Sequence, residues 1–153
     1  MLFDIGIAGV TYCLGSKILH NSDLGKEHAN WDFDEITKRS GVISRPIAAP
    51  HETALDLGER ALSLLLEDLK ISADEIGALI FCTQTPDYPL PSNSSLLHGR
   101  LGMRTTTMSF DITHACSGFI YGVGIGKSLI MGELTENVVL VTADTYSQIA
   151  SRK

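Results

Sequence analysis

The residues best suited to chemistry lie in the segment D-I-T-H-A-C-S-G-F, residues 111–119. The apolar pattern predicts a strand over 108–112 and a long helix over 117–131. Cys116 therefore lies where a strand leads into a helix. The free N–H groups and the dipole at a helix N-terminus favour a negatively charged thiolate. Small neighbouring residues leave room for a substrate carbonyl, and backbone N–H groups could bind an oxyanion. This pattern indicates a nucleophilic cysteine.

Composition alone favours another interpretation of Cys116, because cysteine is among the residue types most often buried in protein cores. Its position at a strand–helix junction balances that expectation, so an active and an inert thiol both remain open. Cys13 and Cys82 lie in or beside predicted strands, and we interpret both as structural. His114 could act as the base for Cys116, but a histidine in the core or in a supporting role is the favoured interpretation.

The elements that must position Cys116 follow from the spacing of apolar residues. From residue 53 onward helices and strands alternate, which is typical of an α/β protein with a sheet that is at least partly parallel. Thr53 is a plausible N-cap, and Ser72 with Glu75 forms a capping-box pattern. The predicted elements are helices over 54–69, 93–101 and 117–131 and strands over 76–83, 108–112 and 137–142.

The first third of the chain is less regular. Residues 3–12 are apolar and rich in β-branched side chains, which predicts a strand. Residues 16–50 are polar and irregular, apart from a short helix predicted over 33–40 and stopped by Gly41. The prolines within residues 44–50 predict no regular element there.

The helix predicted after Cys116 carries glycine at three positions of one face, Gly118, Gly122 and Gly126. Each glycine inside a helix costs about 0.5–1 kcal/mol relative to alanine. The stripe therefore predicts that another backbone packs very close to this face. It also predicts a buried helix, packed against an element that need not belong to this chain.

Composition and charge exclude several function classes. The 153 residues are 44% hydrophobic and 20% charged, which fits one globular domain. Twelve Lys and Arg against 18 Asp and Glu give a net charge of −6, without the basic clusters that nucleic-acid binding requires. Neither a membrane span nor a signal peptide is recognisable, so we expect a cytoplasmic protein. The dispersed cysteines and histidines predict no metal site.

Three segments resemble the β-ketoacyl-acyl-carrier-protein synthase III family of the thiolase superfamily. D-I-T-H-A-C-S-G-F-I-Y-G looks like its active-site segment. K-R-S-G-V-I-S-R, from Lys38, resembles its R-T-G-I-x-x-R stretch, and T-Q-T-P-D-Y-P-L-P-S, from Thr83, resembles its T-x-T-P-D-x-x-x-P-S loop. The resemblance implies an α/β, thiolase-like fold, one half of it, with a mixed, mostly parallel sheet. It also implies helices on both faces and a buried central helix after the nucleophile.

The function implied by the resemblance is acyl transfer. Cys116 would take an acyl group from acyl-CoA, for condensation with malonyl-carrier protein in fatty-acid or related biosynthesis. Acyl-CoA is then a substrate, and no separate cofactor is implied. Arg39 matches an arginine at the nucleotide end of CoA, whereas Glu35 replaces the family's aromatic residue and leaves the thioester donor open. Leu90 matches a loop position that reaches across a homodimer to the partner's acyl pocket.

Family members are built from two similar halves, and their catalytic histidine and asparagine belong to the second. We therefore interpret residues 1–153 as an N-terminal thiolase-like half domain, with the C-terminal half absent from this chain. We expect the chain alone to be acylated without catalysing condensation. Two other interpretations stay open. One is a non-catalytic interaction subunit that pairs with a separate C-terminal chain, and the other is a cysteine hydrolase of acyl thioesters with His114 or His98 as base.

Overall fold

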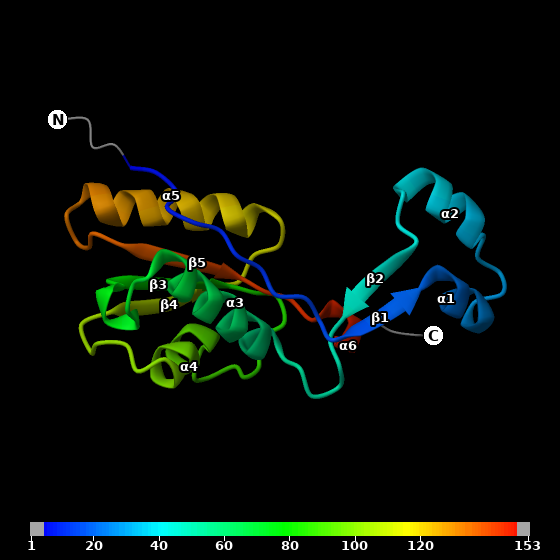
Figure 1. Ribbon diagram of the computed structural model, residues 1–153, viewed down its shortest axis with the longest axis horizontal. Helices are drawn as coiled ribbons and strands as arrows, with labels where there is room; N and C mark the ends of the chain where they lie inside the picture. The colour runs from blue at the N-terminus through cyan, green and yellow to red at the C-terminus, as the bar shows by residue number, and fades with distance from the viewer. Residues whose placement is uncertain (1–4, 150–153) are drawn as a thin grey trace.

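In the computed structural model, which describes residues 5–149, three parallel strands form the central sheet in the order β4-β3-β5 (Figure 1). Helix α5 covers one face of this sheet, and α3 and α4 cover the other (Figure 1). The predicted alternation of helices and strands around a parallel sheet is therefore confirmed. The bounds are α3 Ala54–Leu69, β3 Ala78–Cys82, α4 Asn93–Arg100, β4 Met108–Ile112, α5 Ser117–Met131 and β5 Val138–Thr142.

Local hydrogen bonds set the ends of two of the predicted elements. At the start of α3, Thr53 Oγ1 accepts a hydrogen bond from Asp56 N at 3.2 Å, and Asp56 Oδ2 accepts one from Thr53 N at 3.1 Å. Ser72 and Glu75 form the predicted capping box around the short 3₁₀ helix η1, Ala73–Glu75. Such caps satisfy backbone N–H groups that the first turn of a helix leaves without partners.

The core lies between the sheet and helices α3 and α4. Phe81, on the central strand β3, is fully buried and packs against α3 at Gly58, where an added Cβ would lie 2.8 Å from its ring. The close approach of this ring to the α3 backbone explains why position 58 holds glycine. The core side chains are Leu55, Leu62, Leu66, Ile76, Leu79, Phe81, Leu97, Met103, Val139 and Val141.

A small unit projects from one end of the α/β layer (Figure 1). Two strands pair antiparallel in it, with Pro46 opposite Ile18. The prediction of no regular element over 44–50 is therefore wrong for its first four residues. A two-stranded ribbon has outer edges where proline loses no ladder bond, so Pro46 is tolerated. The bounds are β1 Lys17–His20, α1 Asn21–Glu27, α2 Phe33–Ser40 and β2 Ser44–Ile47.

Helix α2 matches the helix predicted over 33–40, and Gly41 ends it with a positive φ of 71°. That backbone conformation favours glycine.

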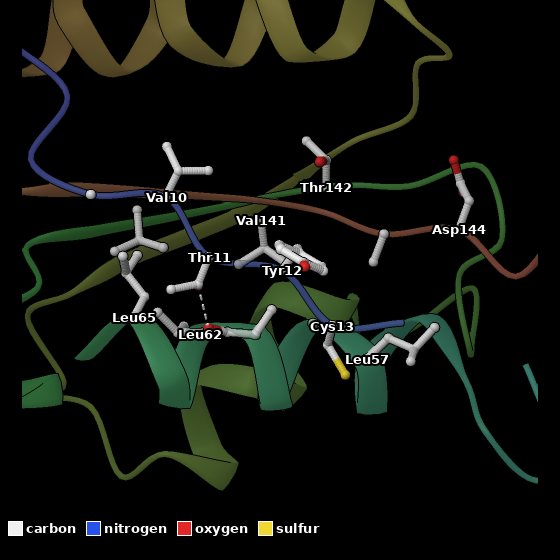
Figure 2. Close-up of a pocket in the computed structure, with 15 residues that line it drawn as sticks. Val10, Thr11, Tyr12, Cys13, Leu57, Leu62, Leu65, Val141, Thr142 and Asp144 are labelled. Carbon is white, nitrogen blue, oxygen red and sulfur yellow. Dashed lines mark hydrogen bonds between the residues drawn. The ribbon is translucent and has the colours of Figure 1, made fainter. Parts of the chain in front are cut away.

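Residues 5–15 form no helix or strand. The strand predicted over 3–12 is therefore wrong for residues 5–12, and residues 3 and 4 lie outside the described part of the chain. The segment passes over α3 and β5, and Thr11 Oγ1 donates a hydrogen bond to Ala61 O of α3 at 2.8 Å (Figure 2). A β-branched run becomes a strand only where a sheet edge pairs with it. Here the segment instead lines one side of a cavity of about 370 Å³ (Figure 2).

The glycine stripe of α5 faces this chain's own sheet. A Cβ added at Gly122 would lie 2.6 Å from Leu140, and one at Gly126 would lie 3.2 Å from Val138. A Cβ at Gly118 would collide with Cys82 Sγ. The prediction of another backbone against this face is therefore wrong. Side chains of β3 and β5 project from the sheet toward α5, and the glycines allow the helix to pack closely against them.

The opposite face of α5 is exposed in this chain, so the element predicted to bury the helix does not lie among residues 5–149. Only the three stripe glycines are buried in it. No element among residues 5–149 covers the outer face (Figure 1). The exposed apolar side chains of α5 are Phe119, Ile120, Tyr121, Val123, Ile125 and Met131.

Glu52, in the loop before α3, links three parts of the chain. Its side chain is 7% exposed. Glu52 Oε2 accepts hydrogen bonds from Ala49 N at 2.8 Å, from Ser16 N at 2.9 Å and from Ser16 Oγ at 2.8 Å. Glu52 Oε1 accepts one from Arg60 Nη2 at 2.7 Å. The N–H groups of Ala49 and Ser16, together with the Arg60 guanidinium, hold the pKa of Glu52 well below its ordinary value.

Glu52→Gln is expected to lower the thermal unfolding midpoint at pH 7 and to flatten its dependence on pH. Because the folded state favours the carboxylate, its contribution to stability is present above the ordinary pKa of glutamate. That contribution is lost as the pH falls toward the lower pKa of the folded state. Thermal unfolding followed by circular dichroism between about pH 7 and pH 3 measures the effect. Glu67→Gln makes the same change at an exposed position of α3. Equal pH slopes for Glu52→Gln and wild type would contradict the prediction.

Candidate active site

Cys116 lies beyond the carboxyl end of β4 and directly before α5. It is the N-cap residue of that helix, with helical backbone angles (φ −48°, ψ −37°), and its side chain makes no capping hydrogen bond. The thiol is exposed. The predicted strand–helix junction is therefore confirmed, and Cys116 is not the buried core thiol that composition favoured. An exposed thiol with no capping bond at a helix N-terminus can act as a nucleophile.

A cavity of about 360 Å³ opens beside Cys116, at the edge of the sheet where the three parallel strands end. The carboxyl ends of parallel strands meet at one edge, which is where α/β proteins place their ligand sites. The lining residues come from the ends of the strands, the loops after them and the helices that follow. They are Cys82, Gln84, His114, Ala115, Cys116, Phe119, Thr142, Ala143, Asp144 and Tyr146.

Cys82 lies beneath the start of α5. It is the last residue of β3, only 5% exposed, and its Sγ donates a hydrogen bond to His114 O at 3.5 Å. Burial raises the pKa of the Cys82 thiol, which keeps it protonated and able to donate. The structural interpretation of Cys82 is thus supported by its burial and its hydrogen bond. Cys13, which we also interpret as structural, is partly buried, and its Sγ contacts Leu14 O at 3.7 Å.

Asp144 joins the loops that follow β3 and β5 at the rim of the cavity. Its Oδ1 accepts hydrogen bonds from Gln84 N at 2.7 Å and from Thr83 Oγ1 at 3.1 Å. Thr85 Oγ1 in turn accepts one from Thr145 N at 2.9 Å. Asp144 was not predicted from the sequence. An aspartate two residues beyond a predicted parallel strand was the available signal, because such positions lie at the edge where sites form.

Arg39 does not lie at this cavity. It is in the last turn of α2, in the projecting unit, and its side chain is 79% exposed. Its Nε donates a hydrogen bond to Glu35 Oε1 at 2.8 Å. Glu35, which stands where the family has an aromatic residue, therefore pairs with Arg39 in this structure. An exposed pair of this kind contributes little stability, so Arg39 can exchange it for another anion at small cost.

Leu90 also lies away from the cavity, in the loop between β3 and α4, and is 84% exposed. The base of this loop is fixed by Asp87, whose Oδ1 accepts hydrogen bonds from Leu55 N and Asn93 Nδ2, each at 3.2 Å. Asp111 accepts from Asn93 N at 2.9 Å and from Ser94 N at 2.8 Å. A well-anchored loop therefore presents an apolar tip to solvent.

The two histidines considered as a base differ in position. His98 Nε2 bonds to Arg104 O at 2.9 Å, and His98 does not line the cavity. His114 is exposed and lines the same cavity as Cys116. The interpretation of His114 as a core residue is therefore wrong, whereas a supporting role stays a prediction, and of the two histidines only His114 lies at the cavity beside Cys116.

The chain is similar in sequence to proteins of one enzyme family. The family profile of 3-oxoacyl-[acyl-carrier-protein] synthase III matches residues 110–153, which include Cys116. The β-ketoacyl-[acyl-carrier-protein] synthase III of Aliarcobacter butzleri is 40% identical over 134 residues, which is 87% of this chain. That of Caldanaerobacter subterraneus is 36% identical over 148 residues, which is 97% of the chain. The chain is related to β-ketoacyl-[acyl-carrier-protein] synthase III.

Solved structures of these synthases share the fold. A 3-oxoacyl-(acyl-carrier-protein) synthase from Burkholderia xenovorans superimposes with a TM-score of 0.91 at 33% identity, covering 95% of this chain and 42% of that one. A 3-oxoacyl-(acyl-carrier-protein) synthase III gives 0.88 at 37% identity, covering 94% and 42%. The thiolase-like fold expected from the resemblance is therefore confirmed. The chain spans 40% of the length of the Aliarcobacter synthase and 44% of the Caldanaerobacter synthase.

Within residues 5–149, no His, Cys, Asp and Glu side chains gather in a group of three or more that could hold a metal ion. None of the helices described there combines the length and the apolar character that a membrane crossing needs.

Proposed function

We propose that this chain carries the acyl-accepting cysteine of a synthase III-type acyltransferase. The Cys116 thiolate attacks the carbonyl carbon of an acyl-CoA thioester, the carbon–sulfur bond to CoA breaks, and the CoA thiol leaves after taking up a proton. The acyl group is then held as a thioester on Cys116. The observation that carries the proposal is the exposed thiol at the start of α5, at the mouth of a cavity in a synthase III fold.

The second reaction in the proposal is condensation with malonyl-carrier protein. Loss of CO₂ from the malonyl group forms a carbon nucleophile that attacks the acyl thioester. A new carbon–carbon bond forms, and Cys116 leaves as a thiolate. The names of the related synthases include the acyl carrier protein. We assign Arg39 a phosphate contact at the nucleotide end of CoA, for which it must leave Glu35. We place the reaction in the cytoplasm, in line with three unpaired cysteines.

The outer face of α5 is assigned to a second thiolase-like half. The relatives are more than twice as long as the matched region, and α5 leaves six large apolar side chains exposed. Several large apolar side chains exposed on one helix are typical of a protein–protein contact. Condensation requires that half, which we expect to supply the remaining catalytic side chains. The exposed Leu90 loop is assigned to a homodimer contact, in which Leu90 lines the acyl pocket of the other copy.

Incubation with acetyl-CoA followed by intact mass measurement tests the proposal. We expect one added acetyl group, which Cys116→Ala abolishes and Cys13→Ala retains. Peptide mapping then places the acetyl group on Cys116. No adduct, together with slow alkylation of Cys116 by iodoacetamide, would contradict an assembled site in this chain. Measurable condensation of malonyl-carrier protein by the chain alone would contradict the requirement for a second half.

Two other functions predict different results when the chain is incubated with acetyl-CoA. His114 beside Cys116 is the observation that favours a thioester hydrolase, which would release free acid and CoA in proportion to time. A non-catalytic subunit would show no adduct and would co-purify with a separate chain carrying the missing histidine and asparagine.

A further inference from the structure

The structure holds His114 in place over the start of α5. Its ring packs on the ring of Tyr121 with centroids 5.0 Å apart and planes inclined by 50°. Its carbonyl accepts the hydrogen bond from Cys82 Sγ. Its Cβ lies 3.0 Å from the position of a Cβ added at Gly118. The imidazole is therefore fixed beside the helical turn that begins at Cys116, and both side chains line one cavity.

The charges around this cavity give the imidazole a specific role. The titratable residues that line the cavity are Cys82, His114, Cys116, Asp144 and Tyr146. Burial raises the pKa of the Cys82 thiol and keeps it protonated. The Asp144 carboxylate opposes a second negative charge at Cys116. Among the lining residues, His114 is then the only side chain that can carry a positive charge.

We propose that His114 is the charge partner of Cys116. The thiol proton of Cys116 passes through water in the open cavity to a ring nitrogen of His114, which leaves an imidazolium and a thiolate in one cavity with no net change in charge. The chain thus contributes to the activation of its own nucleophile. This inference rests on the proposed function, in which that thiolate attacks the acyl thioester.

The pH dependence of alkylation tests the pairing. Rates of iodoacetamide addition at Cys116 are measured from about pH 5.5 to 9.5 by peptide mass, which separates Cys116 from Cys13 and Cys82. We expect His114→Gln to slow the reaction about tenfold near pH 6 and less than about twofold near pH 9.5, because a positively charged partner matters most where few thiols ionise unaided. His51→Gln is the matched control, because His51 is exposed and does not line the cavity.

Variants at Tyr121 provide a second test. Tyr121→Ala removes the ring on which His114 packs and is expected to lose more of the low-pH rate than Tyr121→Phe, which keeps the ring. Coincident pH profiles for His114→Gln and wild type would overturn the pairing. If acetyl-CoA labels Cys116 while those profiles coincide, the proposed function stands and the pairing fails. If the profiles differ without acetylation, the pairing stands and the proposed function fails.

Discussion

Phe81→Ala is expected to lower the free energy of unfolding by about 3–5 kcal/mol. Phe81 is fully buried in the middle strand of the sheet and packs against the α3 backbone at Gly58. Removing the ring loses its transfer free energy and leaves a cavity that two rigid elements cannot close. Single domains have total stabilities of about 5–15 kcal/mol, so this variant is expected to be marginally folded. Urea unfolding followed by circular dichroism measures the difference.

Phe119→Ala is the matched control, because it removes the same ring from a position that is 50% exposed on the outer face of α5. We expect a change within about 0.5 kcal/mol. If the two alanine variants lost equal stability, the core would not lie between the sheet and α3 as described.

The elements that the sequence predicted well are those that local chemistry alone determines. Helix α3 combines an N-cap at Thr53 with apolar residues at helical spacing, and the Ser72–Glu75 capping box uses side chains three residues apart. Residues 138–142 form an apolar β-branched run between turn residues, which is the usual pattern of a buried parallel strand. In each case the determining contacts lie within a few residues along the chain.

The elements that the sequence predicted poorly depend on distant partners. Residues 5–12 have the composition of a strand but lie over α3 and β5 without pairing, while residues 44–47 contain proline and yet pair with β1. A strand exists only where a second strand offers its edge, and pattern within one segment does not contain that information.

The candidate active site was likewise predicted only where it depends on local sequence. The junction at Cys116 is local and was predicted, whereas the cavity beside it is built where loops from three strands meet. Gln84, Asp144 and Tyr146 line it, and none of them was singled out from the sequence. The glycine stripe correctly indicated a close approach to α5, but periodicity could not tell whether a backbone or the side chains of the sheet would approach.

Gly118→Ala is expected to destabilise the chain by about 1–3 kcal/mol, although alanine normally favours a helix over glycine. The new Cβ would collide with Cys82 Sγ and lie 3.0 Å from His114 Cβ. The start of α5 must then move away from the sheet, and Cys116 moves with it. We expect acetylation of Cys116 to slow about tenfold or more, because transfer depends on the placement of the thiol. Urea unfolding and the rate of acetylation measure the two effects.

Gly124→Ala provides the control on the same helix. A Cβ added at Gly124 meets no atom within 4 Å, so only the helix propensity changes. This variant is expected to gain about 0.5–1 kcal/mol and to keep the reactivity of Cys116. A similar loss of stability in both variants would mean that the collision at Gly118 is not the cause.

Adding Cys82→Ala to Gly118→Ala isolates the contact itself. The substitution removes Sγ, and the nearest atom of residue 82 is then its Cβ, 3.8 Å from the new methyl group. Alone, Cys82→Ala leaves a small cavity and loses its bond to His114 O, at a cost of about 1–2 kcal/mol. In the double variant we expect most of the acetylation rate to return and the loss of stability to be smaller than the sum of the two single losses, with a coupling energy of about 1–2 kcal/mol. Simple additivity would contradict the prediction. Recovery of the acetylation rate would mean that Cys82 Sγ, at the end of β3, sets the distance between α5 and the sheet. That atom would then also set the position from which Cys116 reacts.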